Sequence, residues 1–181
     1  READLSTNAL AAYLEADFKL WKGFTFKPGV RHEAIRQERS VGLRGGMGGV
    51  GGEVTTHETL FGFGLLQEVS EGVNLYFSAR KAFQPLTFNE AVDPTSGTSG
   101  NLSPETSMNY EGGVRLERSD LGLSAEVGLF RLDFDNQVVS ESGVLVNAGK
   151  TRHQGIEAAG AFSPSQLPGL SFDGSLMLLD T

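Results

Sequence analysis

The chain has 181 residues, a formal net charge of −8 and a hydrophobic fraction of 39%. This is enough apolar material for one folded domain, so a disordered tail is excluded, and the negative charge excludes a nucleic-acid partner, whose binding requires a basic surface. The 24 Gly and 12 Phe occur without any Cys, which excludes disulfides, thiolate metal sites and cysteine nucleophiles. No apolar run of about 18 residues is present, so a membrane-spanning helix is excluded, whereas membrane-spanning strands are not.

Apolar and polar residues alternate in segments that are separated by turn residues, and this period of two predicts β-strands. In the segment 108–116, Tyr110 and Val114 occupy one predicted face and Glu111 occupies the other. The apolar residues change parity around Leu129-Phe130, where we predict a β-bulge. In chain order, about eight strands are predicted, near residues 10–20, 24–33, 59–69, 73–80, 108–117, 121–129, 154–162 and 170–178.

The predicted connections alternate in length. Short turns are expected at residues 21–23, 70–72, 119–120 and 163–169, and longer loops at 39–54, 84–105 and 136–148. Short turns on one side and long loops on the other are typical of outer-membrane β-barrels, whose long loops face outside. A soluble carbohydrate-binding β-sandwich has no reason to segregate its loops in this way, but it remains an alternative, as does a complete small eight-stranded outer-membrane barrel of structural or enzymatic role.

Charged residues recur on one predicted face of the strands, and they are too many for a dry core. They indicate the watery lumen of a wide barrel, since narrow barrels are filled by their own side chains while barrels of about 22 strands hold a plug domain. These residues are Glu15, Asp17, Lys19, Arg31, Glu33, Arg80, Glu111, Arg115, Glu117 and Glu126.

The two ends of the sequence show no export signal and no stop. The chain begins Arg1-Glu2-Ala3-Asp4 and ends inside the apolar run Leu176-Met177-Leu178-Leu179. For an exported barrel we therefore expect a longer protein, of which residues 1–181 form part of the barrel domain.

Two glycine-containing motifs do not fit the pattern of a phosphate-binding loop. Gly149-Lys150-Thr151 has Gly143 one residue too far upstream and is followed by a predicted strand. The run from Gly45 to Gly52 is also not followed by a helix, which such a loop requires, and it is interpreted as a loop tip.

The histidines and hydroxyl residues do not predict a catalytic or metal centre. His32, His57 and His153 are the only histidines, and no two share one strand face at ligand spacing. Asn101-Leu102-Ser103 fits a glycosylation pattern without further support, and no serine is singled out as a nucleophile. A three-histidine metal site stays open as an alternative to the expectation of no catalytic residue, no metal ligand and no cofactor.

Several segments, in order along nearly the whole chain, together resemble the TonB-dependent receptors, and within them the ferric citrate and related ferric-siderophore receptors. Each motif is short, and the order and spacing of the set carry the resemblance. The motifs are Pro28-Gly29-Val30-Arg31-His32-Glu33, Gly72-Val73-Asn74-Leu75-Tyr76-Phe77-Ser78, Ala82-Phe83-Gln84-Pro85, Asn101-Leu102-Ser103-Pro104-Glu105, Tyr110-Glu111-Gly112-Gly113-Val114-Arg115, Gly128-Leu129-Phe130, Phe134-Asp135-Asn136-Gln137 and Gly149-Lys150-Thr151-Arg152-His153-Gln154-Gly155-Ile156-Glu157.

The resemblance implies an all-β, antiparallel up-and-down transmembrane barrel in the bacterial outer membrane, here without the plug domain and the closing C-terminal strand. It implies import of a ferric chelate, either a siderophore or ferric citrate, with TonB acting through an N-terminal region that this sequence lacks and with outer-membrane lipid around the barrel. An anionic chelate favours arginine for charge-assisted hydrogen bonds. Arg44 and Arg80, with Gln84 and Gln137 at loop entries, are the ligand-binding candidates.

Overall fold

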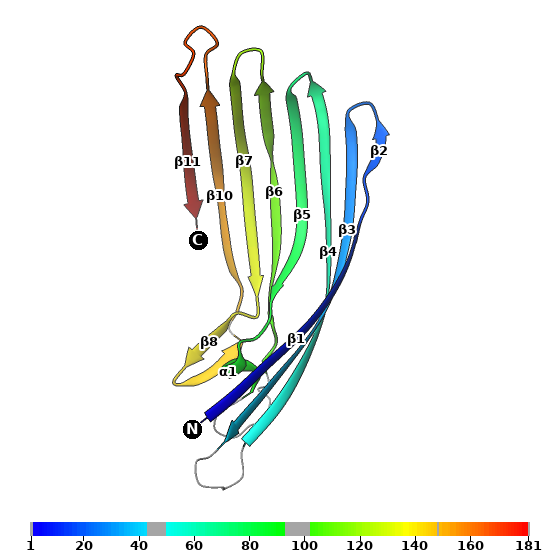
Figure 1. Ribbon diagram of the computed structural model, residues 1–181, viewed down its shortest axis with the longest axis vertical. Coiled ribbons are helices and arrows are strands. Elements are labelled where there is room, and N and C mark those ends of the chain that lie inside the picture. The colour runs from blue at the N-terminus through cyan, green and yellow to red at the C-terminus, as the bar shows by residue number, and fades with distance from the viewer. Residues whose placement is uncertain (1, 43–49, 93–101, 148, 181) are drawn as a thin grey trace.

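The computed structural model describes residues 2–42, 50–92, 102–147 and 149–180, and most of them lie in one large antiparallel sheet (Figure 1). The strands of the sheet follow one another in chain order, so each pairs with its neighbours in sequence. A separate two-stranded sheet and one short helix lie in the connections. The elements are β1 (Glu2–Glu15), β2 (Phe18–Trp21), β3 (Phe24–Gly42), β4 (Val50–Ser70), β5 (Val73–Gln84), α1 (Phe88–Ala91), β6 (Glu105–Arg118), β7 (Leu123–Asp135), β8 (Val138–Glu141), β9 (Val144–Asn147), β10 (Thr151–Phe162) and β11 (Phe172–Asp180).

The prediction of about eight strands is confirmed for the path of the large sheet, whereas the hairpin of β8 and β9 lies within residues 136–148, which were predicted to be a loop. The sheet order is β1-β3-β4-β5-β6-β7-β10-β11, and β2 continues the run of β1 along the same partner, β3. The short turns that join β2 to β3, β4 to β5, β6 to β7 and β10 to β11 lie at one end of the sheet, at the top of Figure 1. The long connections lie at the other end, which is called the long-loop end below.

The prediction of a loop over residues 39–54 is wrong at both of its ends. β3 continues to Gly42 and β4 begins at Val50, because the two strands pair in unbroken register out to Val41 and Val50. Polar residues occupy both faces of this extension, so the hydrophobic alternation that marks the other strands fades there. Backbone pairing between the two strands still holds them extended.

Paired residues of an antiparallel sheet point to the same face, so the register separates two faces. One unbroken cross-strand row contains only apolar side chains and one glycine: Phe26, Leu65, Phe77, Gly112, Leu129, Ile156 and Leu178. The face that carries this row is called the outer face. The opposite, inner face carries the charged residues that the sequence placed together, among them Arg31, Arg80 and Arg115.

The β-bulge predicted around Leu129-Phe130 is wrong. β7 pairs with β6 and with β10 without a register shift over its full length. The change of parity instead marks a change of surroundings: Leu129 faces outwards, and the next outer positions are Arg131 and Asp133. Phe130 turns to the inner face, where its ring carbons stand 2.7–2.8 Å from the position that a Cβ on Gly155 would occupy.

The apolar band of the outer face is oblique to the strands. Leu178 is its last residue towards the long-loop end of β11, and the next outer position is Asp180. The cross-strand row that contains Leu178 meets β3 at Phe26. On β1 the last apolar residue of the band is Leu10, which pairs with Ala34 of β3, eight residues beyond Phe26. In a barrel whose strands are about 4.8 Å apart and tilted by about 40°, a level edge moves along each successive strand by about 4 Å, which is just over one residue. Over the seven steps from β11 to β1, the edge therefore moves by about eight residues. The band therefore has the slope expected of a level membrane across tilted barrel strands.

Burial is inverted relative to a soluble domain. Large apolar side chains of the sheet are exposed, such as Leu10 at 75% and Leu176 at 62%. The most buried apolar residues instead belong to the β5–β6 connection, where Leu86, Ala91 and Val92 form a small core around α1. Among the described residues, no second sheet covers the outer face and β1 does not pair with β11, so neither alternative fold is favoured. The described part of the chain also contains no helix long and apolar enough to cross a membrane.

Candidate functional site

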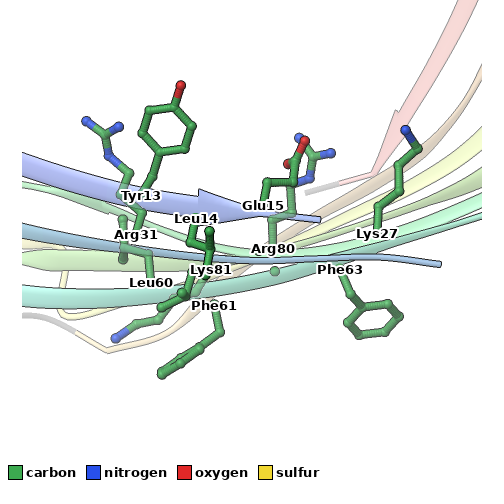
Figure 2. A pocket seen from close by; sticks show the side chains of 13 residues that line it. Tyr13, Leu14, Glu15, Lys27, Arg31, Leu60, Phe61, Phe63, Arg80 and Lys81 are labelled. Carbon is green, nitrogen blue, oxygen red and sulfur yellow. The ribbon is translucent and has the colours of Figure 1, made fainter. Parts of the chain in front are cut away.

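A cluster of charged residues lies on the inner face of β1, β3 and β5. Figure 2 shows Tyr13, Glu15, Lys27, Arg31 and Arg80 on one side of the sheet. Phe61 and Phe63, also shown in Figure 2, extend from the opposite side. The alternation of β4 and its neighbours thus separates an ionic inner surface from an aromatic outer surface within the thickness of one sheet.

The cations of this cluster differ in how they are paired. Lys27 forms an ion pair with Asp17 at 2.7 Å, and Arg31 forms one with Glu33. Among the described residues, Arg80 has no ion-pair partner, and its side chain is exposed. Arg80 crosses the neighbouring strand at Gly62, where an added Cβ would stand 3.0 Å from the Arg80 Cγ. The glycine gives the long, exposed side chain room to lie along the wall.

The four predicted ligand-binding residues have different settings. Arg44 lies outside the described residues. Gln84 is the exposed last residue of β5, and Gln137, between β7 and β8, accepts a hydrogen bond from the Thr151 hydroxyl at 3.0 Å. The structure therefore leaves Arg80 and Gln84 open to a ligand and gives the Gln137 side chain a partner within the wall. The assignment of all four as ligand-binding residues remains a prediction.

The sequence did not indicate Lys27 and Arg31, the neighbours of Arg80, as ligand-binding candidates. Lys27 and Arg31 were visible only as charged residues of a separate strand, because their approach to Arg80 depends on the registers of β3, β4 and β5 together. Glycines within the neighbouring strands could have indicated this cluster, because long charged side chains lie across them. Gly62 lies opposite Arg80, and Gly29 lies opposite Glu15.

A second inner-face cluster lies nearer the short turns, on β5, β6 and β7. Arg115 donates two hydrogen bonds to Glu126, at 2.9 and 3.2 Å, and its guanidinium carbon stands 5.7 Å from the centre of the Tyr76 ring. The Tyr76 hydroxyl lies over two adjacent glycines, 2.8 Å from the positions that a Cβ on Gly113 or on Gly128 would occupy. Because each side chain fixes another, this cluster fits a rigid part of the wall.

The long connections are tied to the strands by side-chain hydrogen bonds. Gln37 donates to the Leu86 carbonyl oxygen at 2.9 Å, and Arg39 donates to Asn89 Oδ1 at 2.6 Å, which holds the α1 segment on the inner face of β3. Farther along the chain, Asn147 bonds both backbone groups of Ser103, at 2.8 and 2.9 Å, and the Asn136 carbonyl oxygen at 2.7 Å. These contacts position structured loops at the mouth of the inner face.

The turn between β6 and β7 carries an ion pair outside the apolar band. Arg118 donates two hydrogen bonds to the Asp120 carboxylate, at 2.9 and 2.7 Å. These bonds hold the pKa of Asp120 below its ordinary value. Within the described residues, no group of three or more His, Asp and Glu side chains is arranged to hold a metal ion.

Consecutive antiparallel strands, an oblique apolar outer band and a charged inner face define the wall of a transmembrane β-barrel. The particular family follows from comparison with known sequences. The profile of the family described as "TonB dependent receptor-like, beta-barrel" matches residues 1–179, and the chain belongs to that family.

Solved structures of several receptors share this fold. The chain is similar to the ferric yersiniabactin uptake receptor FyuA from Yersinia pestis, with 22% identity and a TM-score of 0.79, over 98% of this chain and 28% of that one. It is similar to the ferric-catecholate import receptor Fiu from E. coli K12, with 18% identity and a TM-score of 0.73, over 99% and 29%. It is also similar to the siderophore receptor PiuA from Acinetobacter baumannii, with 15% identity and a TM-score of 0.79, over 98% and 26%. The chain thus spans less than a third of the length of each of these receptors.

Proposed function

We propose that the complete protein is a receptor of the bacterial outer membrane that imports a ferric chelate, siderophore or ferric citrate, with energy supplied through TonB. Residues 1–181 form part of its barrel domain, and lipid surrounds the outer face. The import of ferric chelates by structural relatives such as FyuA and Fiu supports this proposal. Since no bond of the substrate changes in such transport, the protein acts by binding and passage and not as an enzyme.

The observation that carries the proposal is the exposed Arg80 guanidinium beside Lys27 and Arg31 on the inner face. Asp17 and Glu33 pair with Lys27 and Arg31, so Arg80 is the cation of this cluster that has no ion-pair partner among the described residues. Anionic oxygens of a ferric chelate match a guanidinium group that has no carboxylate partner among the described residues. Gln84 and Gln137, and Arg44 from the β3–β4 connection, are proposed to add contacts from the long-loop end.

The test is chelate binding by the full-length receptor in detergent, measured by fluorescence quenching with ferric citrate and with one ferric siderophore each of the catecholate and hydroxamate types. Arg80→Gln should weaken binding of the anionic chelate roughly 10- to 100-fold, because it removes a charged hydrogen bond of about 1.5–3 kcal/mol. Arg118→Gln, at the opposite end of the wall, is the matched control and should bind as the parent does. Equal affinity of the parent and Arg80→Gln for every chelate bound would refute the role of Arg80.

Energy coupling needs a separate measurement in cells. Uptake of the radiolabelled ferric chelate should stop in cells that lack TonB, while binding at the cell surface should remain. Uptake that persists without TonB would refute this part of the proposal without touching the binding site.

A further inference from the structure

Two histidines that are far apart in the sequence meet on the outer face of neighbouring strands. His32 of β3 pairs with Thr59 of β4, and His57 of β4 pairs with Ala34 of β3, so the two imidazoles are diagonal neighbours. Their ring centres are 6.1 Å apart and their planes differ by 19°. Both side chains are exposed. Residue spacing within one strand does not reveal this pair, because the pair forms only across the register of two strands.

The His32 ring is already oriented by a neighbour. Its Nδ1 lies 2.9 Å from the Thr59 hydroxyl oxygen. When Nδ1–H donates to this oxygen, the lone pair stays on Nε2, the nitrogen left free for a ligand. A metal-binding histidine in proteins characteristically has its other ring nitrogen held in this way. No hydrogen bond between described residues restrains the His57 ring, which can therefore turn towards a metal bound to His32 Nε2.

The spacing of the rings suits one shared ion. A metal bound at about 2.0–2.1 Å from a ring nitrogen stands about 3.2 Å from the ring centre, so two rings on one metal have centres about 4.5 Å apart in cis and about 6.4 Å apart in trans. The observed 6.1 Å lies inside this range, and the stacked rings must turn for both nitrogens to face one ion. We propose that His32 and His57 form a two-imidazole site for a divalent transition metal, with water completing the coordination.

The surrounding residues favour copper(II) or nickel(II) over a structural zinc ion. Two nitrogens with water oxygens suit the tetragonal geometry of these ions, whereas structural zinc takes four protein ligands, and the described residues offer no group of three. The nearest cation along this face, Arg36, is paired with Glu53 at 2.7 Å, which reduces its repulsion of a bound metal. We therefore expect an exchangeable ion.

The site is placed where water and ions reach it. Val30 and Phe61 are the last large apolar residues of the outer face on β3 and β4 before the histidines, so the imidazoles lie at the edge of the apolar band. At this depth a side chain meets the headgroup region and not hydrocarbon. The site is thus on the face opposite to Arg80 and separate from the proposed chelate site.

The experiment uses the full-length receptor without an affinity tag, titrated with Cu²⁺ in a non-chelating buffer and followed by electron paramagnetic resonance and calorimetry. The parent should bind one Cu²⁺ with two nitrogen ligands at this site. His32→Ala and His57→Ala should each remove it, with affinity falling roughly 100-fold, and Thr59→Val should weaken it roughly 10-fold because the ring loses its support. His153→Ala, which removes the histidine of another strand, should leave it unchanged.

Heat-dependent gel migration checks that each variant is folded, and His57→Asn provides a second, polar replacement. A copper site that persists unchanged in folded His32→Ala and His57→Asn would overturn the proposal, as would a spectrum with one nitrogen ligand in the parent. A site that disappears in His153→Ala would also overturn it. Because chelate binding is measured separately, failure here leaves the proposed transport function untouched.

Discussion

The contact between Tyr76 and two glycines allows a graded test of how tightly the wall is built. A methyl group at Gly113 would overlap the Val127 carbonyl oxygen and approach Gly128 Cα at 2.9 Å, and both of these atoms belong to the backbone. A methyl group at Gly128 would meet only the Tyr76 hydroxyl closely, at 2.8 Å. At Gly160 the nearest atom would be a carbonyl oxygen at an ordinary 3.5 Å.

The three alanine substitutions should therefore destabilise the receptor to different degrees. Gly113→Ala should lower the free energy of unfolding by about 3 kcal/mol, the upper part of the range for overpacking, because strand backbones must separate. Gly128→Ala should lower it by about 1 kcal/mol, because only a side-chain tip must move. Gly160→Ala should be neutral or raise it by up to about 1 kcal/mol, since alanine restricts the unfolded chain.

Removal of the Tyr76 hydroxyl distinguishes the two clashes. Tyr76→Phe should rescue Gly128→Ala almost fully, with a coupling of about 1 kcal/mol in the double-mutant cycle, and should rescue Gly113→Ala only in part. The assay is denaturant unfolding of the full-length receptor in phospholipid vesicles. Equal losses at Gly160 and Gly113, or full rescue of Gly113→Ala by Tyr76→Phe, would refute this account of the packing.

Val127→Arg, on the outer face, should lower the free energy of unfolding in vesicles by about 2–4 kcal/mol. Ala159→Arg, on the inner face of the next strand, should have little effect. Similar losses of unfolding free energy in the two variants would contradict the assignment of faces. Asn147→Ala removes three hydrogen bonds between loops and should speed hydrogen exchange in both connections that it joins, with Ser140→Ala as an exposed control and unchanged exchange as the contrary result. Because the pKa of Asp120 is lowered, its ion pair with Arg118 stabilises the turn in full above the unfolded pKa of about 3.9, and this stabilisation is lost as pH falls through the lower folded pKa. Asp120→Asn should therefore reduce the pH dependence of the stability of this turn, followed by NMR during an acid titration.

The sequence by itself determined the eight-strand path of the large sheet and the sorting of apolar from charged residues, but not the extensions of β3 and β4 or the β8–β9 hairpin. A period of two is a local property, since successive side chains of a strand point to opposite faces whatever the strand pairs with. The segment 108–116 therefore predicted both β6 and its orientation, with Val114 outwards and Arg115 inwards. The positions of the short turns followed from local residue types in the same way, and the ordered motifs indicated the family.

Only the tertiary structure decided which residues of different strands meet. The approach of Arg80 to Lys27 and Arg31, and of His32 to His57, depends on a cross-strand register that neither strand encodes alone. Barrel tilt had the same kind of effect. It moves the apolar band along successive strands, so the parity change at Phe130 reflects where β7 leaves the membrane, and a local pattern could not separate this from a bulge.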